Sequence, residues 1–286
     1  MKSRSFNILV VTDLSSVYSD TSGKGSVDGV RMAVEDFGGS VNGVPIKVMV
    51  LDNKLDVALT LNKTRELIDT EGVNLITDVT SSAAAIAVAK LANERKVTTT
   101  FVSPGTTVLT GDACSKYTWH YAWDTTAMAT AARKVTELGA KRWYFITADY
   151  AFGQSLYEQF SKQVVKAGGT VLGDDKTPFP NDDFSSYLLK AQDAKAEAIG
   201  LLNSGQDLRN AVKQAGEFGL TDKIKIVPGQ MNFSDIRATG LSAWSGIIAG
   251  EIWYWNTDEQ TRAWAERFYK RNGYQPGSLH AGNYSA

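Results

Sequence analysis

The sequence is poor in the residues that build metal sites and covalent cross-links. Its 286 residues include one cysteine, Cys114, and two histidines, His120 and His280. A single cysteine forms no internal disulfide, and neither histidine stands at a metal-ligand spacing. The cysteine count neither requires nor excludes an oxidising compartment. We therefore expect no metal ion and no cofactor.

Charge of one sign and long apolar runs are also lacking. The formal net charge is −1, which gives no basic surface for nucleic acid and no polybasic membrane patch. The longest apolar runs are far shorter than a bilayer span. An apolar content of 43% with 21% charged residues is typical of a globular protein. The length allows two domains.

Motifs of catalysis are missing as well. Neither G-x-S-x-G nor G-x-x-x-x-G-K-[ST] occurs. The stretch G-K-G-S-V-D-G at residues 23–29 imitates a dinucleotide fingerprint. Its third glycine is one residue late, and about ten residues separate it from the preceding strand. The acid pairs at 174–175 and 182–183 are best interpreted as loop charges. We expect a protein that is not an enzyme.

What the sequence has is a regular alternation of strand and helix patterns. This alternation predicts a parallel sheet covered on both faces in residues 1–107 and a second α/β unit in residues 124–245. The predicted strands are 6–14, 45–52, 73–79, 97–102, 119–124, 142–148, 170–174, 198–202, 224–227 and 246–255, and the predicted helices are 27–37, 57–70, 83–94, 126–138, 152–167, 184–193, 207–218 and 257–271.

The basic start at residues 1–4, followed by the apolar residues 6–11, superficially suggests a signal peptide. The apolar part is too short and has no cleavage-type segment after it, so we interpret it as the first strand. If the natural protein is exported, we expect its leader to be absent from this sequence.

Polar residues follow two consecutive predicted strands. Ser81 and Ser82 precede an alanine-rich helix, and Ser103, Gly105 and Thr107 follow the next strand. Consecutive strands of a strand–helix–strand unit are parallel, so both ends lie at the same sheet edge, where such sheets bind ligands. Hydroxyls and a helix N-terminus there suit a carboxylate. The alternative is that one end only caps a helix and the other only forms a turn.

Aromatic and amide residues gather near other strand ends. Tyr121 and Trp123 lie where a connecting strand is expected, and Tyr150 and Phe152 follow a strand. Aromatic walls favour a flat ring, at about 1 kcal/mol per ring pair beyond burial. For Trp119 we prefer packing in the core.

Two amide residues also stand at strand ends. Asn203 and Gln230 are placed to hydrogen-bond a ring hydroxyl, or alternatively to form turns. Two segments, 119–124 and 246–253, are expected to join the units, so that the lobes close around a ligand like a hinge.

Several stretches in order resemble a known family. V-N-L-I-T-D-V-T-S-S, V-S-P-G-T-T, Y-F-I-T-A-D-Y-A-F-G and L-L-N-S-G-Q-D are similar to type I periplasmic solute-binding proteins of ABC importers. The nearest class is the receptors of branched-chain amino acids, amides and aromatic acids. G-D-A-C-S-K-Y-T-W-H-Y-A-W-D-T resembles the subgroup that takes up aromatic carboxylates.

This resemblance implies an α/β fold of two Rossmann-like lobes with parallel sheets joined by crossover strands. Lobe one would be residues 1–120 and 250–286, and lobe two residues 121–249. The family normally continues beyond residue 286, so the resemblance implies that the C-terminal part of lobe one is missing. A companion chain that supplies this part is a further expectation.

The resemblance also implies contacts. Ser81 and the N–H groups near Ser82 match the position that holds the ligand carboxylate. Further matches are a backbone contact at Gly105, a hydroxyl contact at Thr107, and aromatic contacts at Phe152 and in the loop of Tyr18.

One family position differs. The acid that pairs with the ammonium of branched-chain amino acids would fall at Gly229 or Gln230, where there is no carboxylate. An unpaired buried ammonium costs roughly 3–5 kcal/mol. We therefore predict a ligand without an α-ammonium group.

The resulting prediction is a periplasmic receptor that binds a benzoate- or cinnamate-type acid and delivers it to the membrane subunits of an ABC permease. Branched-chain amino acid or amide binding is the alternative ligand class. A ligand sensor with the same fold is a second hypothesis, which a cytosolic start of the natural protein would favour over an export leader. An NAD-dependent enzyme is a third.

Overall fold

The computed structural model describes residues 5–286, and the basic start discussed above, residues 1–4, lies outside the described part. The described chain divides into two compact units. Unit 1 comprises the residues up to Ala122 together with Trp253–Ala286, and unit 2 is Trp123–Ile252. Each unit has its own sheet, and nearly all strand pairs are parallel, so the predicted α/β class is confirmed. No helix in residues 5–286 is long and apolar enough to cross a membrane.

The sheet of unit 1 has six strands in the order β2-β3-β1-β4-β5-β6. Only β2 and β3 pair antiparallel, through a turn at Asn42 and Gly43 that both have positive φ. β1 is central, and its Leu9, Val10 and Val11 are fully buried. The strands are β1 (Phe6–Thr12), β2 (Ser40–Val41), β3 (Val44–Asp52), β4 (Val73–Asp78), β5 (Thr98–Phe101) and β6 (Thr118–His120).

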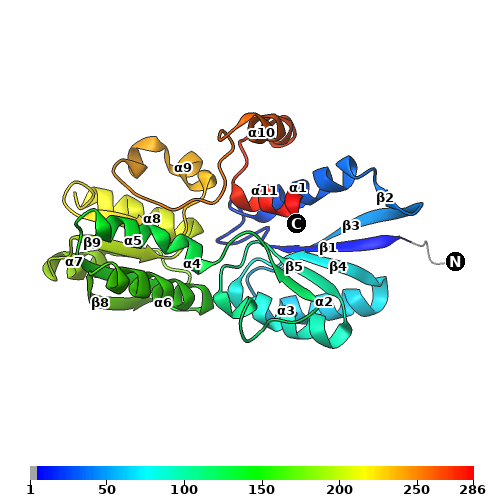
Figure 1. Ribbon diagram of the computed structural model, residues 1–286, viewed down its shortest axis with the longest axis horizontal. Helices are drawn as coiled ribbons and strands as arrows, with labels where there is room; N and C mark the ends of the chain where they lie inside the picture. The colour runs from blue at the N-terminus through cyan, green and yellow to red at the C-terminus, as the bar shows by residue number, and fades with distance from the viewer. Residues whose placement is uncertain (1–4) are drawn as a thin grey trace. The chain divides into compact units, whose positions relative to one another are not determined.

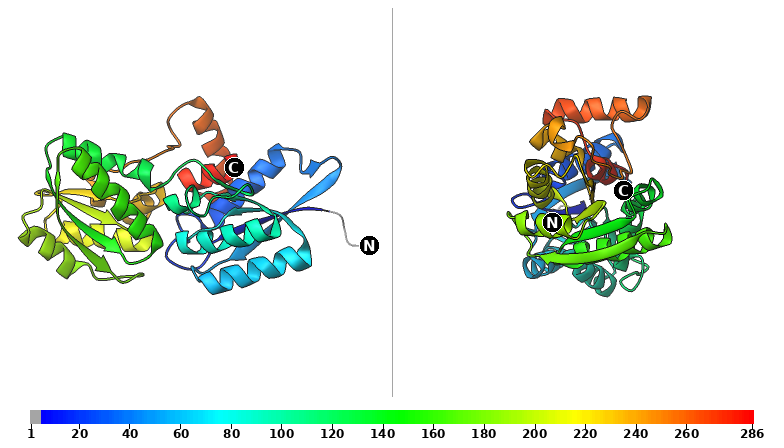
Figure 2. Two further views of the ribbon diagram at one scale, coloured as in Figure 1. Left: turned by 60° about the horizontal axis from the view of Figure 1, so that its bottom comes forward. Right: turned by 90° about the vertical axis from the view of Figure 1, so that its left-hand side faces the viewer.

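Helices cover both faces of this sheet (Figure 1). Because side chains alternate along a strand, Leu9 and Val11 pack with residues of α3, whereas Ile8 and Val10 pack with α1. Helices α2 and α3 lie side by side on the first face (Figure 2). The helices of unit 1 are α1 (Gly23–Asp36), α2 (Val57–Glu71), α3 (Ser82–Arg95), the 3-10 helix η1 (Thr107–Leu109), α10 (Glu259–Asn272) and α11 (Ser278–Ser285).

The glycines of the G-K-G-S-V-D-G stretch lie in α1, where two of them, Gly25 and Gly29, let α11 approach closely. A Cβ at Gly25 would lie 2.4 Å from the ring of His280, and a Cβ at Gly29 would lie 2.5 Å from its carbonyl oxygen. The His280 ring stacks on Phe268 of α10, with 5.2 Å between ring centroids. Helix packing therefore accounts for two of the three glycines that imitate a dinucleotide fingerprint.

Unit 2 is built on a four-stranded sheet in the order β10-β9-β7-β8, with every pair parallel. Ile146 of β7 faces the core made with α7 and α8, and its neighbour Phe145 makes an edge contact with Tyr157 of α6. The elements are β7 (Arg142–Ala148), β8 (Thr170–Thr177), β9 (Ala198–Leu202), β10 (Lys225–Pro228), α4 (Thr125–Met128), α5 (Thr130–Glu137), α6 (Ala151–Lys166), α7 (Ser185–Asp193), α8 (Gly205–Glu217), α9 (Phe233–Thr239) and the 3-10 helix η2 (Leu241–Trp244).

The predicted strand at 246–255 is wrong, because this segment is irregular. Its apolar residues pack one at a time: Ile247 against the core of unit 2, and Trp253 edge-on against Trp264. The N–H of Ile248 donates a backbone hydrogen bond of 3.4 Å to the carbonyl of Ile226 in β10. A strand forms only where a neighbouring strand pairs with it, and an alternating apolar pattern does not show whether such a neighbour exists.

The predicted strand at 119–124 is shorter than expected. β6 ends at His120 and pairs with β5 at the edge of the sheet of unit 1. Trp119 is 52% exposed, so its predicted place in the core is wrong. An edge strand has only one neighbour, and the face that carries this side chain is left partly open to solvent.

Replacement of Gly29 by alanine tests the close packing of α1 and α11. Because the added methyl group would meet backbone rather than a flexible side chain, we expect Gly29→Ala to lower the free energy of unfolding by about 1–3 kcal/mol. Urea unfolding measures it.

The matched control is Gly216→Ala in α8, where a Cβ meets nothing within 4 Å. Alanine favours a helix there by up to about 1 kcal/mol, so this variant should be at least as stable as the parent. Equal stability of the two variants would contradict the packing argument.

Candidate functional site

The strand order of each sheet reverses at one point. In unit 1, β3 lies on one side of β1 and β4 on the other; in unit 2, β8 and β9 flank β7 in the same way. The loops that leave two such neighbouring strands run to opposite faces of the sheet, which opens a crevice at the carboxyl ends of the strands. The loops after β1 and β4, and those after β7 and β9, are therefore the candidate binding edges of the two units.

The loop between β4 and α3 has an unusual backbone. Asp78, Val79 and Ser81 have φ values of 74°, 56° and 95°, which side chains other than glycine rarely adopt. The Ser81 hydroxyl accepts a 3.4 Å hydrogen bond from the N–H of Ala84 and so caps α3. Ser82 is 1% exposed, and its hydroxyl has no hydrogen-bond partner among the described residues. A hydroxyl without a partner and the first N–H groups of a helix are groups that can bind an anion.

The loop after β5 lies beside it, because β4 and β5 are paired. Ser103 is buried and donates its hydroxyl proton to the carboxyl group of Asp78. Gly105 is buried, and Thr107 begins η1 with its side chain partly exposed. Since the single hydroxyl proton of Ser103 is used by Asp78, Ser103 meets a ligand only as an acceptor. The two predicted clusters of unit 1 thus lie on adjacent loops.

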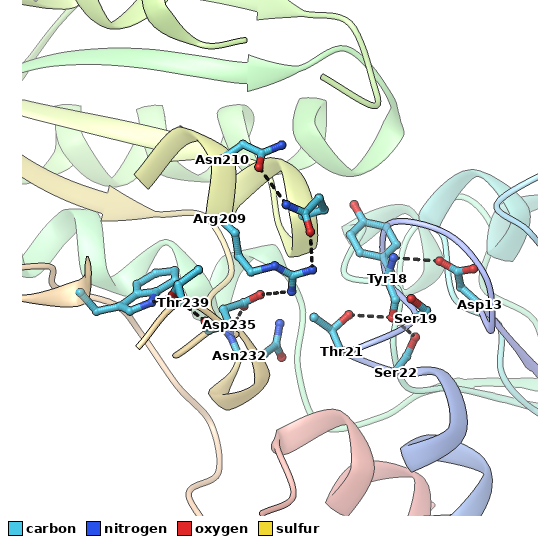
Figure 3. A network of polar contacts seen from close by, with 12 residues as sticks. Asp13, Tyr18, Ser19, Thr21, Ser22, Arg209, Asn210, Asn232, Asp235 and Thr239 are labelled. Carbon is cyan, nitrogen blue, oxygen red and sulfur yellow. Dashed lines mark hydrogen bonds and ion pairs between the residues drawn. The ribbon is translucent and has the colours of Figure 1, made fainter. Parts of the chain in front are cut away.

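The loop after β1 carries Tyr18, which is buried (Figure 3). The carboxylate of Asp13 accepts hydrogen bonds from the N–H groups of Ser16, at 2.9 Å, and Tyr18, at 2.8 Å. The carbonyl of Tyr18 accepts from the hydroxyls of Thr21 and Ser22 just before α1. Asp13 was missed by sequence reasoning, although an acid at the end of a buried strand is a common anchor for the loop that follows.

Aromatic rings gather at the edge of unit 2. Tyr150 stacks on Phe179, with centroids 4.2 Å apart and an angle of 13° between the rings. Phe152 makes an edge contact with Trp123 at 6.2 Å. Tyr121 lies in unit 1 and is 38% exposed. Phe179 was missed by sequence reasoning; its position two residues after the end of β8 is the signal that would have found it.

An amide group is buried without a partner at the same edge. Asn203 follows β9, is 1% exposed, and neither atom of its side-chain amide has a hydrogen-bond partner within residues 5–286. The helices α6 and α8 start beside it, and their N-cap residues Tyr150 and Ser204 make no side-chain cap. Gln230, which follows β10, is also buried. This edge offers donors and acceptors next to aromatic rings.

A buried ion pair shapes the neighbouring loop (Figure 3). The guanidinium group of Arg209 in α8 lies 2.9 Å from the carboxylate of Asp235 in α9 and donates to Gln206 at 2.9 Å. Asp235 also accepts from the N–H of Asn232 at 2.8 Å. The pair ties α9 to α8. Sequence reasoning missed it because its members lie on different helices.

One acid at this edge has an altered titration. Asp207 lies in the first turn of α8 and is buried, and it accepts a 3.1 Å hydrogen bond from the N–H of Asn181. Burial raises the pKa of Asp207 to about 7. No group of three or more His, Cys, Asp or Glu side chains within residues 5–286 is placed to hold a metal ion.

Comparisons with known proteins agree with this architecture. The model of a family described as periplasmic binding protein matches residues 5–286. A periplasmic binding protein from Burkholderia mallei is 40% identical, with a TM-score of 0.95 over 99% of this chain and 76% of that chain. No curated protein sequence gives a significant match.

Two further solved structures are similar. A branched chain amino acid ABC transporter periplasmic ligand-binding protein from Burkholderia xenovorans LB400 is 33% identical, with a TM-score of 0.83 over 98% of this chain and 75% of that one. A solute binding protein of an ABC transporter from Rhodopseudomonas palustris BisB5, in complex with 3,4-dihydroxy benzoic acid, is 23% identical, with a TM-score of 0.88 over 99% and 78%. At 23% identity, the similarity to the R. palustris protein shows a shared fold alone.

The titration of Asp207 predicts a pH dependence of stability. Its pKa in the folded chain, about 7, lies above its ordinary value of 3.8, so between these values the folded state holds a proton that the unfolded state has lost. Stability therefore falls as the pH rises through this window, by an amount on the order of a few kcal/mol at most. Asp207→Asn keeps an acceptor for Asn181 and should flatten the fall, as measured by urea unfolding from pH 4 to pH 8.

Asp183→Asn is the control for this measurement. A backbone hydrogen bond from Ser185 lowers the pKa of Asp183, so its removal cannot flatten a fall of stability with rising pH. An Asp207→Asn profile as steep as that of the parent would contradict the assignment.

Proposed function

Because the chain belongs to the periplasmic binding protein family, we propose that it is the solute-binding receptor of an ABC importer and that its solute is a small aromatic carboxylate. The proposal rests above all on Ser82. This buried hydroxyl lacks a partner among the described residues and stands at the N-terminus of the 14-residue helix α3. A carboxylate there accepts from the hydroxyl and from helix N–H groups, and the helix dipole favours its charge.

The rings of unit 2 support an aromatic ligand. Tyr150, Phe152 and Trp123 are linked by ring contacts, and Phe179 extends the group. A flat ring gains offset or edge contacts with such side chains. The R. palustris protein that holds 3,4-dihydroxy benzoic acid has the same fold, so this fold accommodates ligands of this class.

The position of the missing ammonium partner also supports an acid without an amino group. A Cβ at Gly229 would lie 2.7 Å from Leu156 Cδ1 and 3.1 Å from the Cα of Leu202. No acidic side chain fits at this position without a shift of its neighbours, and the next residue, Gln230, is neutral. A buried ammonium at this place would lack a counter-charge, at a cost of roughly 3–5 kcal/mol.

In this proposal the two units are the two lobes of the receptor. Unit 1 binds the carboxylate, and closure adds ring contacts from unit 2, so that the ligand stabilises the closed state through its greater affinity for it. The closed, loaded receptor then meets the membrane subunits of the permease outside the cytoplasm.

An amino acid is the second candidate ligand, and one observation favours it. Asp207 is a buried acid whose pKa is raised by burial, and a ligand ammonium would be a counter-charge for it. The protein from B. xenovorans that is named for branched-chain amino acids is a relative. In this alternative Asp207→Asn would abolish stabilisation by leucine.

A thermal-shift panel distinguishes the two ligand classes. Benzoate, 4-hydroxybenzoate and cinnamate should raise the melting temperature, and leucine and valine should leave it unchanged. At a concentration of 100 times the dissociation constant, the stabilisation is about 2.7 kcal/mol. A shift with leucine alone would replace the first proposal by the second.

Ser82→Ala tests the acid contact. Loss of one hydrogen bond to a charged group costs about 1.5–3 kcal/mol, so the affinity for 4-hydroxybenzoate should fall roughly 10- to 100-fold in calorimetry. Ser185→Ala is the matched control, because Ser185 is likewise the first residue of a helix, α7. Unchanged affinity in Ser82→Ala would remove α3 as the acid-binding helix.

A further inference from the structure

The carboxyl group of Asp78 is buried below the candidate acid-binding loops of unit 1. Asp78 is the last residue of β4 and is fully buried. Its Oδ1 accepts from the Ser103 hydroxyl and, at 3.1 Å, from Nδ2 of Asn283. Its Oδ2 lies 3.3 Å from the Thr80 hydroxyl. The side chains that hydrogen-bond this carboxyl group are thus neutral hydroxyls and an amide.

The backbone around Asp78 requires support from outside the loop. Asp78, Val79 and Ser81 all have positive φ, and such residues cost on the order of 1 kcal/mol or more each and persist only where the surrounding structure fixes them. The support includes N–H groups and carbonyls: the N–H of Thr80 donates to Val11, and the carbonyl of Thr80 accepts from the side chain of Asn53. The carboxyl group of Asp78 adds to this support through its bond from Ser103.

The same carboxyl group connects the two loops. Ser103 belongs to the loop after β5, and its hydroxyl proton is directed at Asp78. The backbone repeats the connection, since the N–H of Val102 donates to the carbonyl of Asp78 at 3.3 Å. The loop that carries Ser81 and Ser82 is thereby held next to the loop that carries Thr107.

Asn283 extends the connection to two helices. Its Nδ2 group has two hydrogens and lies within hydrogen-bond distance of three acceptors: Asp78, the Ser26 hydroxyl of α1 at 3.1 Å and the Leu279 carbonyl of α11 at 3.0 Å. One carboxyl group therefore links β4, the loop after β5, α1 and α11. Burial raises the pKa of Asp78, and the hydrogen bonds from Ser103 and Asn283 act in the opposite direction.

We infer that Asp78 is the positioning residue of the acid-binding edge: it holds the β4–α3 loop and the β5–η1 loop in the shape that aims Ser82 and the start of α3 at a ligand. Its role is to accept hydrogen bonds, so an asparagine can replace it. The inference rests on the proposed function for what the loops bind, but not for how they are held.

Hydrogen exchange measured by mass spectrometry tests the holding of the loops without any ligand. In Asp78→Ala, peptides that cover residues 79–85 and 102–109 should exchange about tenfold faster than in the parent, because the loss of hydrogen bonds opens these loops locally. In Asp78→Asn they should exchange as in the parent. Ser103→Ala, which removes the side-chain link between the loops and leaves the backbone link from Val102, should accelerate the same two segments.

Ile76→Ala is the matched control, because Ile76 is fully buried on the same strand and its side chain has no polar atom. It lowers stability through a cavity but should leave the pattern of exchange among peptides unchanged. Exchange in Asp78→Ala that rises uniformly, as in Ile76→Ala, would overturn the inference, as would unchanged loops. If Asp78→Ala does not fold, Ser103→Ala decides: parent-like exchange of both loops overturns the inference.

Calorimetry with 4-hydroxybenzoate then tests the link to function. Affinity should fall about tenfold in Ser103→Ala, which leaves Ser82 in place, and stay near the parent value in Asp78→Asn. Absence of binding to the parent protein would count against the proposed ligand, whereas the exchange experiment would still decide the role of Asp78. Altered exchange of the loops with unchanged affinity would overturn the positioning role.

Discussion

The reversal of strand order in each sheet is the constraint on which the remaining structure depends. Because strand–helix–strand connections are right-handed, the helices that follow β1 and β4 cover opposite faces of the first sheet, and those that follow β7 and β9 cover opposite faces of the second. The loops diverge at these two places, and the first N–H groups of α3, α6 and α8 have no partner inside their own helices. Both candidate edges arise there.

The buried polar groups at these edges fall into two classes. Asp13, Asp78 and the pair of Arg209 and Asp235 are hydrogen-bonded and give the loops their shape. Ser82 and Asn203 have side-chain atoms without partners among the described residues. An unsatisfied buried group lowers stability by about 1–3 kcal/mol, so the second class costs stability and leaves hydrogen-bonding capacity for a bound molecule. The proposed role as a solute receptor requires both classes, one to shape the loops and one to contact the ligand.

Two misleading patterns show how far local sequence signals extend. Glycines at 23–29 imitate a phosphate-binding turn, yet Gly25 and Gly29 serve the contact of α1 with α11, more than 240 residues later in the chain. The apolar segment at 246–255 alternates like a strand, yet its side chains pack singly. In both cases the local pattern indicates that the segment makes a close or apolar contact. Only the fold shows which residues it contacts.

The sequence by itself determined the alternation of strands and helices, the parallel pairing, and the arrival of Ser81, Ser82, Ser103 and Thr107 at one sheet edge, because periodicity and chain connectivity are local properties. The tertiary structure alone decided which side chains already have a partner within the protein and which are exposed to solvent. Asp78 receives its hydrogen bond from Asn283 across 205 positions of sequence, Tyr150 stacks on Phe179, and Trp119 stands open at a sheet edge. Such contacts join elements that are distant in sequence, so they depend on how helices and strands pack, which no local pattern records.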